Sequence, residues 1–227
     1  MELNSYMANL GKYIVIEGSD GTGKTTQMNM LRDYLQAQGK TVHITSEPAD
    51  PNDEDEPLPI ARELRKLIKN GEIDRTPESN LLLFTAARVE KWRYEIQPKL
   101  DEGAYVVSSR NYWSTLAYQG HGEGLDPGLI MQQTSLYLDE RYIHPDAAVI
   151  LHLEDENTRL ARVQTRGLRE VKDTFETKDA TFQASVAEGY ITTAQDYNVP
   201  LVSADGTQED VFERILDKLQ IHISMKQ

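Results

Sequence analysis

The chain has 227 residues, of which 39% are hydrophobic and 27% are charged. This composition is typical of a globular protein with a sizeable core and excludes a disordered chain. The formal net charge of −13 argues against binding to nucleic acid, which needs a surplus of Lys and Arg. With no cysteine, disulfides and thiolate metal sites are excluded. No secretory signal and no apolar run of about 18 residues is visible, so we expect a cytoplasmic location without membrane contact.

Five short apolar runs, rich in β-branched residues, predict strands that are covered on both faces. They lie at 13–17, 41–45, 104–108, 147–153 and 199–204. Helical patterns separate them, and strands that alternate with helices favour a doubly wound α/β fold. We therefore expect a five-stranded parallel sheet flanked by helices, in one domain over 1–227 with a flexible N-terminus at about 1–11.

The helical patterns carry their own boundary signals. After the first strand, Met28, Leu31 and Leu35 share one helix face, and Gly39 is placed to end that helix. A long pattern covers 78–100, where Pro98 should kink or end the helix. The closing pattern at 208–223 is amphipathic. The segment 49–59 places five acidic residues among three prolines, which predicts a solvated loop.

The clearest motif runs over 18–25, GSDGTGKT, and fits the P-loop pattern of Gly, four residues, Gly, Lys, then Ser or Thr. Glycines let successive N–H groups point at one phosphate chain, and the N-terminus of the following helix adds positive potential. Lys24 would reach the terminal phosphates, and the Thr25 hydroxyl would ligate Mg²⁺. We therefore predict a P-loop NTPase fold that binds a nucleoside triphosphate through Gly18, Ser19, Asp20, Gly21, Thr22, Gly23, Lys24, Thr25 and Thr26.

The class of P-loop protein can be narrowed by what the chain lacks. A GTPase would need an Asn-Lys-x-Asp segment, which does not occur. A motor or transporter ATPase would need a longer chain and a strand that ends in Asp or Asp-Glu. The remaining class is a small phosphotransferase, in which a second substrate lies opposite the P-loop.

Beyond the P-loop, the chain resembles the thymidylate kinase family from about Tyr13 to its C-terminal helix. The resemblance rests on IEGSDGTGKTTQ, Glu47-Pro48, LLLFTAARVEKW and STLAYQG. It implies roles for one set of acceptor-binding residues: Asp20 at the 3′-hydroxyl, Glu47 near the acceptor phosphate, Phe84 stacked on thymine, Arg88 bonded to the base, Tyr118 against the 2′ position, and Thr115 and Gln119 facing the pyrimidine.

Some of these assignments also follow from the residues themselves. Phe84 and Arg88 are four residues apart, so they project from one helix face and suit a pyrimidine with carbonyl acceptors. Arg110 follows the third predicted strand, where ligands bind in open α/β sheets. Its guanidinium could bridge the acceptor phosphate and the transferring phosphoryl group. The family usually has Asp directly before this Arg, whereas this chain has Ser109.

A stripe of four arginines adds the last group of expected phosphate-binding residues. Arg159, Arg162, Arg166 and Arg169 recur at steps of three, four and three, which places them on one helix face. The resemblance implies a basic lid at about 162–178, as in bacterial-type members that keep the catalytic Arg there. The expected catalytic residues are therefore Lys24, Arg110, Arg162 and Arg166.

The resemblance implies a homodimer that transfers the γ-phosphoryl group of ATP to dTMP with Mg²⁺, in dTTP synthesis. Two other functions stay open at this point. One is a deoxynucleoside kinase, although the Glu-Arg-Ser element of that family is missing after the third strand. The other is a catalytically weakened nucleotide-binding regulator that has kept the P-loop.

Overall fold

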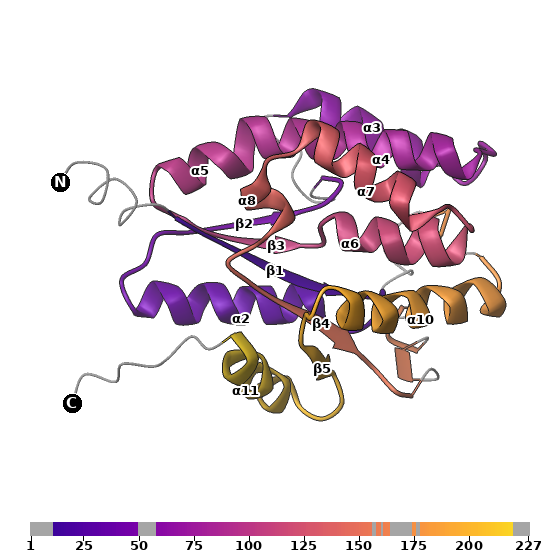
Figure 1. Ribbon diagram of the computed structural model, residues 1–227. Helices are drawn as coiled ribbons and strands as arrows, with labels where there is room; N and C mark the ends of the chain where they lie inside the picture. The colour runs from indigo at the N-terminus through magenta and orange to yellow at the C-terminus, as the bar shows by residue number, and fades with distance from the viewer. Residues whose placement is uncertain are drawn as a thin grey trace.

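The computed structural model describes residues 11–49, 58–155, 158–159, 161–163, 174–175 and 178–219. Its centre is a sheet of five strands in the order β2-β3-β1-β4-β5, and all neighbouring strands are parallel (Figure 1). The strands are β1 (Lys12–Gly18), β2 (Val42–Ser46), β3 (Tyr105–Ser109), β4 (Ala147–His152) and β5 (Leu201–Ser203). Each overlaps one of the five apolar runs, so the prediction of a five-stranded parallel sheet is confirmed.

Helices cover both faces of the sheet (Figure 1). One face carries α2 (Lys24–Ala37) and α11 (Gln208–Leu219), and the other carries α4 (Pro77–Lys91), α6 (Tyr112–Thr115) and α10 (Ala180–Asp196). The remaining elements are α3 (Pro59–Lys69), α5 (Gln97–Asp101), α7 (Pro127–Tyr137), α8 (Glu140–Ile143) and the π-helical segments η1 (Trp92–Ile96) and η2 (Leu116–Gly122). Within the described part of the chain, none of the helices has the length and apolar character needed to cross a membrane.

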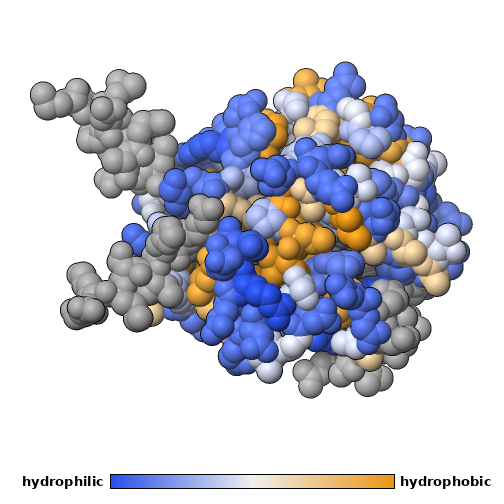
Figure 2. Space-filling view, turned by 60° about the horizontal axis from the view of Figure 1, so that its bottom comes forward, coloured by the Kyte–Doolittle hydropathy of each residue, from blue (hydrophilic) through white to orange (hydrophobic). Residues whose placement is uncertain are grey.

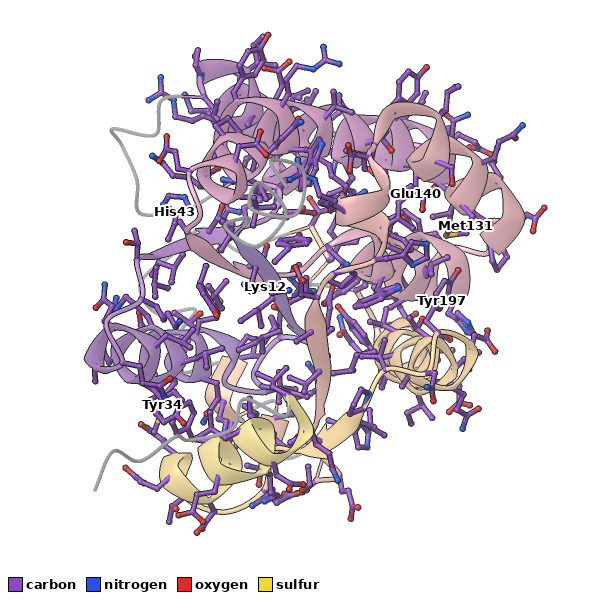
Figure 3. The ribbon with its side chains drawn as sticks, turned by 60° about the vertical axis from the view of Figure 1, so that its left-hand side comes forward. Lys12, Tyr34, His43, Met131, Glu140 and Tyr197 are labelled. Carbon is purple, nitrogen blue, oxygen red and sulfur yellow. The ribbon has the colours of Figure 1, made fainter. Side chains whose placement is uncertain are left out.

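The central strand β1 separates two hydrophobic cores, because successive strand side chains point to opposite faces. Tyr13 and Val15 pack among side chains of α4, α6, η2 and α10. Ile14 and Ile16 pack against α2 and α11. Tyr34 contributes to this second core from α2, with its ring 5.9 Å from the ring of Phe212 in α11 (Figure 3). Figure 2 shows a mostly hydrophilic outer face with apolar side chains gathered near its middle.

Gly39 ends α2 as predicted. Its φ of 77° is in the left-handed region, which glycine adopts without strain. The N–H of Gly39 donates to the carbonyl of Gln36 at 2.9 Å, and the N–H of Lys40 donates to the carbonyl of Leu35 at 3.1 Å. This pair of bonds is the Schellman motif. It turns the chain out of α2 and toward β2.

Pro98 does not end the long helix, which was one of the two predicted outcomes. The regular α-helical pattern is instead interrupted directly before it. The helix runs from α4 through η1 into α5 and stops at Asp101. Pro98 has no N–H to give to the previous turn, and the chain forms one wider turn directly before it. There, the N–H of Gln97 donates to the carbonyl of Trp92, five residues back.

Several predictions lie outside the described residues. They concern most of the N-terminal segment at about 1–11, the acidic loop Asp50 to Glu56, and most of the lid at about 162–178, including Arg166 and Arg169.

Candidate active site

The P-loop connects β1 to α2 at the carboxyl end of the sheet, where β2 and β3 also end. Gly18 has a φ of 136°, which lets the backbone curl directly after the strand. The buried Lys24 returns over the loop, and its Nζ donates to the carbonyls of Gly18 and Ser19 at 2.9 Å each. Thr25 is exposed in the first turn of α2. The loop thus curls between the end of β1 and the start of α2, with Lys24 held against its own backbone.

Arg110 joins this loop to the end of β3. Its Nη2 donates to Asp20 Oδ1 at 2.6 Å, and Lys24 Nζ lies 3.7 Å from the same oxygen. The hydroxyl of Tyr118 donates to Asp20 Oδ2 at 3.1 Å. Burial alone would raise the pKa of Asp20, but the charges of Arg110 and Lys24 lower it well below its usual range. The carboxylate beside Arg110 thus comes from the P-loop and not from position 109.

The backbone of Arg110 has an unusual conformation. Its φ is 74°, in the left-handed region that a residue with a Cβ rarely adopts. The N–H of Arg110 donates to the carbonyl of Ile16 at 3.2 Å, and Ser108 Oγ donates to the carbonyl of Arg110 at 2.8 Å. Its Nη1 donates to Ser114 Oγ at 3.0 Å and to the hydroxyl of Tyr190 at 2.7 Å. Both ends of this residue are therefore fixed.

Glu17, at the end of β1, binds the turn after β3 that contains Arg110. Its carboxylate is fully buried and accepts the backbone N–H groups of Asn111 at 2.7 Å, Ser114 at 3.1 Å and Gly18 at 3.2 Å. It also accepts the hydroxyls of Ser114 at 2.8 Å and of Tyr190 at 3.2 Å. Hydrogen bonds to a carboxylate are about twice as strong as neutral ones, so Glu17 anchors the turn that carries Arg110.

A buried ion pair connects the end of β2 to α4. Arg88 Nε donates to Glu47 Oε2 at 2.9 Å, and the hydroxyl of Tyr142 donates to Glu47 Oε1 at 2.5 Å. Arg88 Nη2 donates to Thr115 Oγ1 at 3.1 Å and to the carbonyl of Asn111 at 3.3 Å. Burial raises the pKa of Glu47, although Arg88 and Tyr142 favour its charged form. The pair thus links α4 to the two segments that follow β2 and β3, and all three carry predicted acceptor residues.

Aromatic rings gather next to these charges. The ring of Phe175 lies 5.9 Å from that of Phe84 and 5.8 Å from that of Tyr118. The guanidinium of Arg110 lies 5.2 Å from the centre of the Tyr118 ring. Leu81 is buried, whereas Phe84 is only partly buried. Phe84 is therefore less enclosed than Leu81, and Arg88 follows it one turn further along α4.

The first part of the arginine stripe lies against the P-loop. Arg159 Nη1 donates to the carbonyl of Asp20 at 3.0 Å, and Arg162 Nη1 lies 3.5 Å from the carbonyl of Gly21. Only glycine fits at position 21, because an added Cβ would lie 2.7 Å from the carbonyl oxygen of Arg159. The packing of the two segments thus brings positive charge to the predicted phosphate site.

Comparison with known proteins decides the family. A sequence model of the family described as thymidylate kinase matches residues 16–215. The thymidylate kinase of Maridesulfovibrio salexigens is 35% identical over 214 residues, which cover 91% of this chain and 94% of that protein. That of Nitratidesulfovibrio vulgaris strain DP4 is 34% identical over 210 residues and covers 90% of each chain. The chain belongs to the thymidylate kinase family.

A solved structure supports the same relationship. The crystal structure of thymidylate kinase from Ehrlichia chaffeensis matches with a TM-score of 0.68 and 26% identity, over 91% of this chain and 97% of that one. The predictions of family and P-loop NTPase fold are thereby confirmed. As a member of the thymidylate kinase family, the protein is a nucleoside monophosphate kinase, which is a transferase.

Sequence reasoning missed several residues of this thymidylate kinase site. Glu17 carried a visible signal, because it is a carboxylate at the end of an otherwise apolar strand. Arg159 belonged to the arginine stripe but was not expected to contact the P-loop. Tyr142 and Tyr190 gave no signal, since a tyrosine in a helical pattern is typical of a core. Within the described residues, no cluster of three His, Asp or Glu side chains could hold a metal ion.

Proposed function

We propose that this kinase transfers the γ-phosphoryl group of ATP to the 5′-phosphate of dTMP and forms dTDP, a step of dTTP synthesis. The observation that carries the proposal is the contact between Asp20 and Arg110 at 2.6 Å. This contact joins the donor side of the site, at the P-loop, to the acceptor side, at the end of β3. In this proposal Arg110 would contact both phosphate groups, because its planar fork suits phosphate oxygens.

On the donor side, the loop over 18–26 would hold the triphosphate by its backbone N–H groups. Lys24 would leave its two carbonyl partners and neutralise the terminal phosphates. Arg162, beside Gly21, and Arg166 in the lid would add charge during transfer, and an arginine in this role can contribute a factor of about 10³ or more to the rate. Lid closure would exclude water and suppress ATP hydrolysis.

Thr25 fits the expected magnesium site. Mg²⁺ keeps several waters and takes only one or two protein oxygens beside the phosphates, so an exposed hydroxyl next to Lys24 is a suitable ligand. When bound, Mg²⁺ would neutralise charge on the transferring phosphoryl group.

On the acceptor side, Phe84 offers an aromatic surface to thymine. Within the described residues, Arg88 uses Nε and Nη2 in hydrogen bonds, which leaves the two N–H groups of Nη1 for a base carbonyl. Tyr118 would crowd the 2′ position, and Thr115 and Gln119 would face the pyrimidine. Asp20 would meet the 3′-hydroxyl, and Glu47 would lie near the acceptor phosphate.

The test is ADP release with a panel of nucleoside monophosphates. We expect dTMP to be the preferred acceptor, and no preference for dTMP would refute the proposal. Phosphorylation of thymidine without activity on dTMP would indicate a deoxynucleoside kinase. ATP binding in calorimetry, without transfer to any monophosphate, would indicate a nucleotide-binding regulator.

We further propose a homodimer that uses the long helix around Phe84. On this helix Leu82 is 56% exposed and Tyr94 is 61% exposed, and burial of such side chains stabilises an interface. Sedimentation of the parent and of a Leu82→Arg variant tests this proposal, since only the variant should be monomeric. A cytoplasmic location remains a prediction.

A further inference from the structure

A chain of polar side chains runs from Arg75, which donates to the last carbonyls of α3, to Gln119 in η2. Arg75 Nε donates to Asn80 Oδ1 at 2.9 Å. Asn80 Nδ2 donates to both carboxylate oxygens of Glu123, at 2.9 and 3.2 Å. Gln119 Nε2 donates to Glu123 Oε2 at 3.0 Å. Asn80 and Gln119 are buried, and the Glu123 side chain is 5% exposed.

The chemistry of the two charged groups fixes the orientation of both amides. A guanidinium can only donate hydrogen bonds, so Asn80 must turn its carbonyl oxygen to Arg75 and its NH₂ to Glu123. A carboxylate can only accept, so Gln119 must also turn its NH₂ to Glu123. The carbonyl oxygen Oε1 of Gln119 is then left over, and no hydrogen bond reaches it from the residues that the structure describes.

This network lies on the acceptor side of the site. Asn80, Phe84 and Arg88 follow each other at steps of four and share one face of α4. Thr115, whose Oγ1 accepts from Arg88, precedes Gln119 by four residues. Phe84 and Arg88 are the side chains proposed to hold the base, and Gln119 is connected to their face of α4 through Glu123 and Asn80.

We infer that Glu123 is a positioning residue that presents the carbonyl oxygen of Gln119 to the acceptor base. This inference rests on the proposed function. Thymine and uracil carry a hydrogen on ring nitrogen N3, and an oxygen acceptor can bind it. Cytosine has a lone pair at N3, so two acceptors would face each other. Glu123 thereby selects pyrimidines that donate from N3.

The variant that tests this role is Glu123→Gln, which keeps the shape and removes the strict acceptor. An amide at position 123 can donate as well as accept, so Gln119 can turn its NH₂ toward the base. We expect the ratio of kcat/KM for dTMP to that for dCMP to fall about tenfold or more, mainly through the KM values, because a misplaced hydrogen-bonding group costs this much discrimination. Glu102→Gln is the matched control, since Glu102 is an exposed carboxylate paired with Lys99. The ratio should not change in this control.

A second measurement uses the parent enzyme, so it does not depend on the folding of a variant. We expect N3-methyl-dTMP, which lacks the donor, to lose a factor of about 100 in kcat/KM against dTMP. Equal use of the two compounds, or an unchanged dTMP to dCMP ratio in a folded Glu123→Gln variant, would overturn the role of Glu123. Absence of any transfer to dTMP by the parent would overturn the proposed function and this inference together. A purely structural role would lower stability or kcat and leave the ratio of the two bases unchanged.

Discussion

Substitution of Glu17 by Gln should destabilise the fold and slow phosphoryl transfer together. In the parent, Glu17 Oε1 accepts the backbone N–H groups of Asn111 and Ser114, and Oε2 accepts the N–H of Gly18. In Glu17→Gln, Oε1 can keep its two partners. The new Nε2 must then replace Oε2, and a donor will face the Gly18 N–H at 3.2 Å.

The size of the effect follows from these contacts. The hydroxyls of Ser114 and Tyr190 can rotate to accept from the new NH₂, so their bonds are kept. The buried Gly18 N–H is left without a partner, which costs about 1–3 kcal/mol. The two bonds to Oε1 lose the contribution of the charge, at roughly 0.5–1 kcal/mol each. The expected loss in the free energy of unfolding is therefore about 3 kcal/mol.

Urea denaturation and single-turnover kinetics measure the two consequences. The urea midpoint should fall, and the transfer rate should fall because the turn that carries Arg110 loses its anchor. Glu102→Gln makes the same chemical change at an exposed site and should leave both quantities unaltered. A stability loss below ~1 kcal/mol in Glu17→Gln would refute the reasoning, because it would mean that the Gly18 N–H finds another partner.

Three further predictions use other parts of the site and the fold. Arg110→Lys should lower kcat by about 10³ while the KM for ATP stays the same, since lysine keeps the charge but loses the fork that binds two phosphates. Ser109→Asp should raise or preserve transfer, and a collapse of the rate would show that Ser109 has a role of its own. Burial would raise the pKa of Glu95, but His43 (labelled in Figure 3) and Lys91 lower it to about 2. A lowered pKa stabilises the fold above the unfolded-state value near 4.5 and stops doing so as the pH falls toward 2, so the parent should lose about 3 kcal/mol more than Glu95→Gln between pH 6 and pH 2 in pH-dependent urea denaturation.

Much of the fold could be predicted because its causes are local. Each strand of a sheet covered on both faces must be apolar along its length, and such runs are visible one by one. The P-loop and Gly39 need glycine for backbone reasons that a short window contains. The disturbance of the helix at Pro98 was predictable because the missing N–H is local, whereas the end of the helix at Asp101 depends on the packing of the whole helix.

The site was predictable only in part, because its contacts join distant segments. Glu17 and Tyr190 are separated by 173 positions and meet only after α10 packs against η2. Asn80 and Glu123 are 43 positions apart, and neither belongs to a motif. Arg88 stood out by its spacing from Phe84, but its ion pair with Glu47 depends on how α4 lies against the end of β2.

The absence of a carboxylate at position 109 does not leave Arg110 without an acidic partner. The backbone of Ser109 still holds the strand end, since its carbonyl accepts the N–H of Glu47 at 3.0 Å. This bond does not depend on the side chain. The charge beside Arg110 comes from Asp20, 90 positions earlier in the chain. Asp20 Oδ1 also lies 3.7 Å from Lys24 Nζ, so one carboxylate balances the charges of both Arg110 and Lys24. A carboxylate at position 109, on β3, would not by itself couple these two cations.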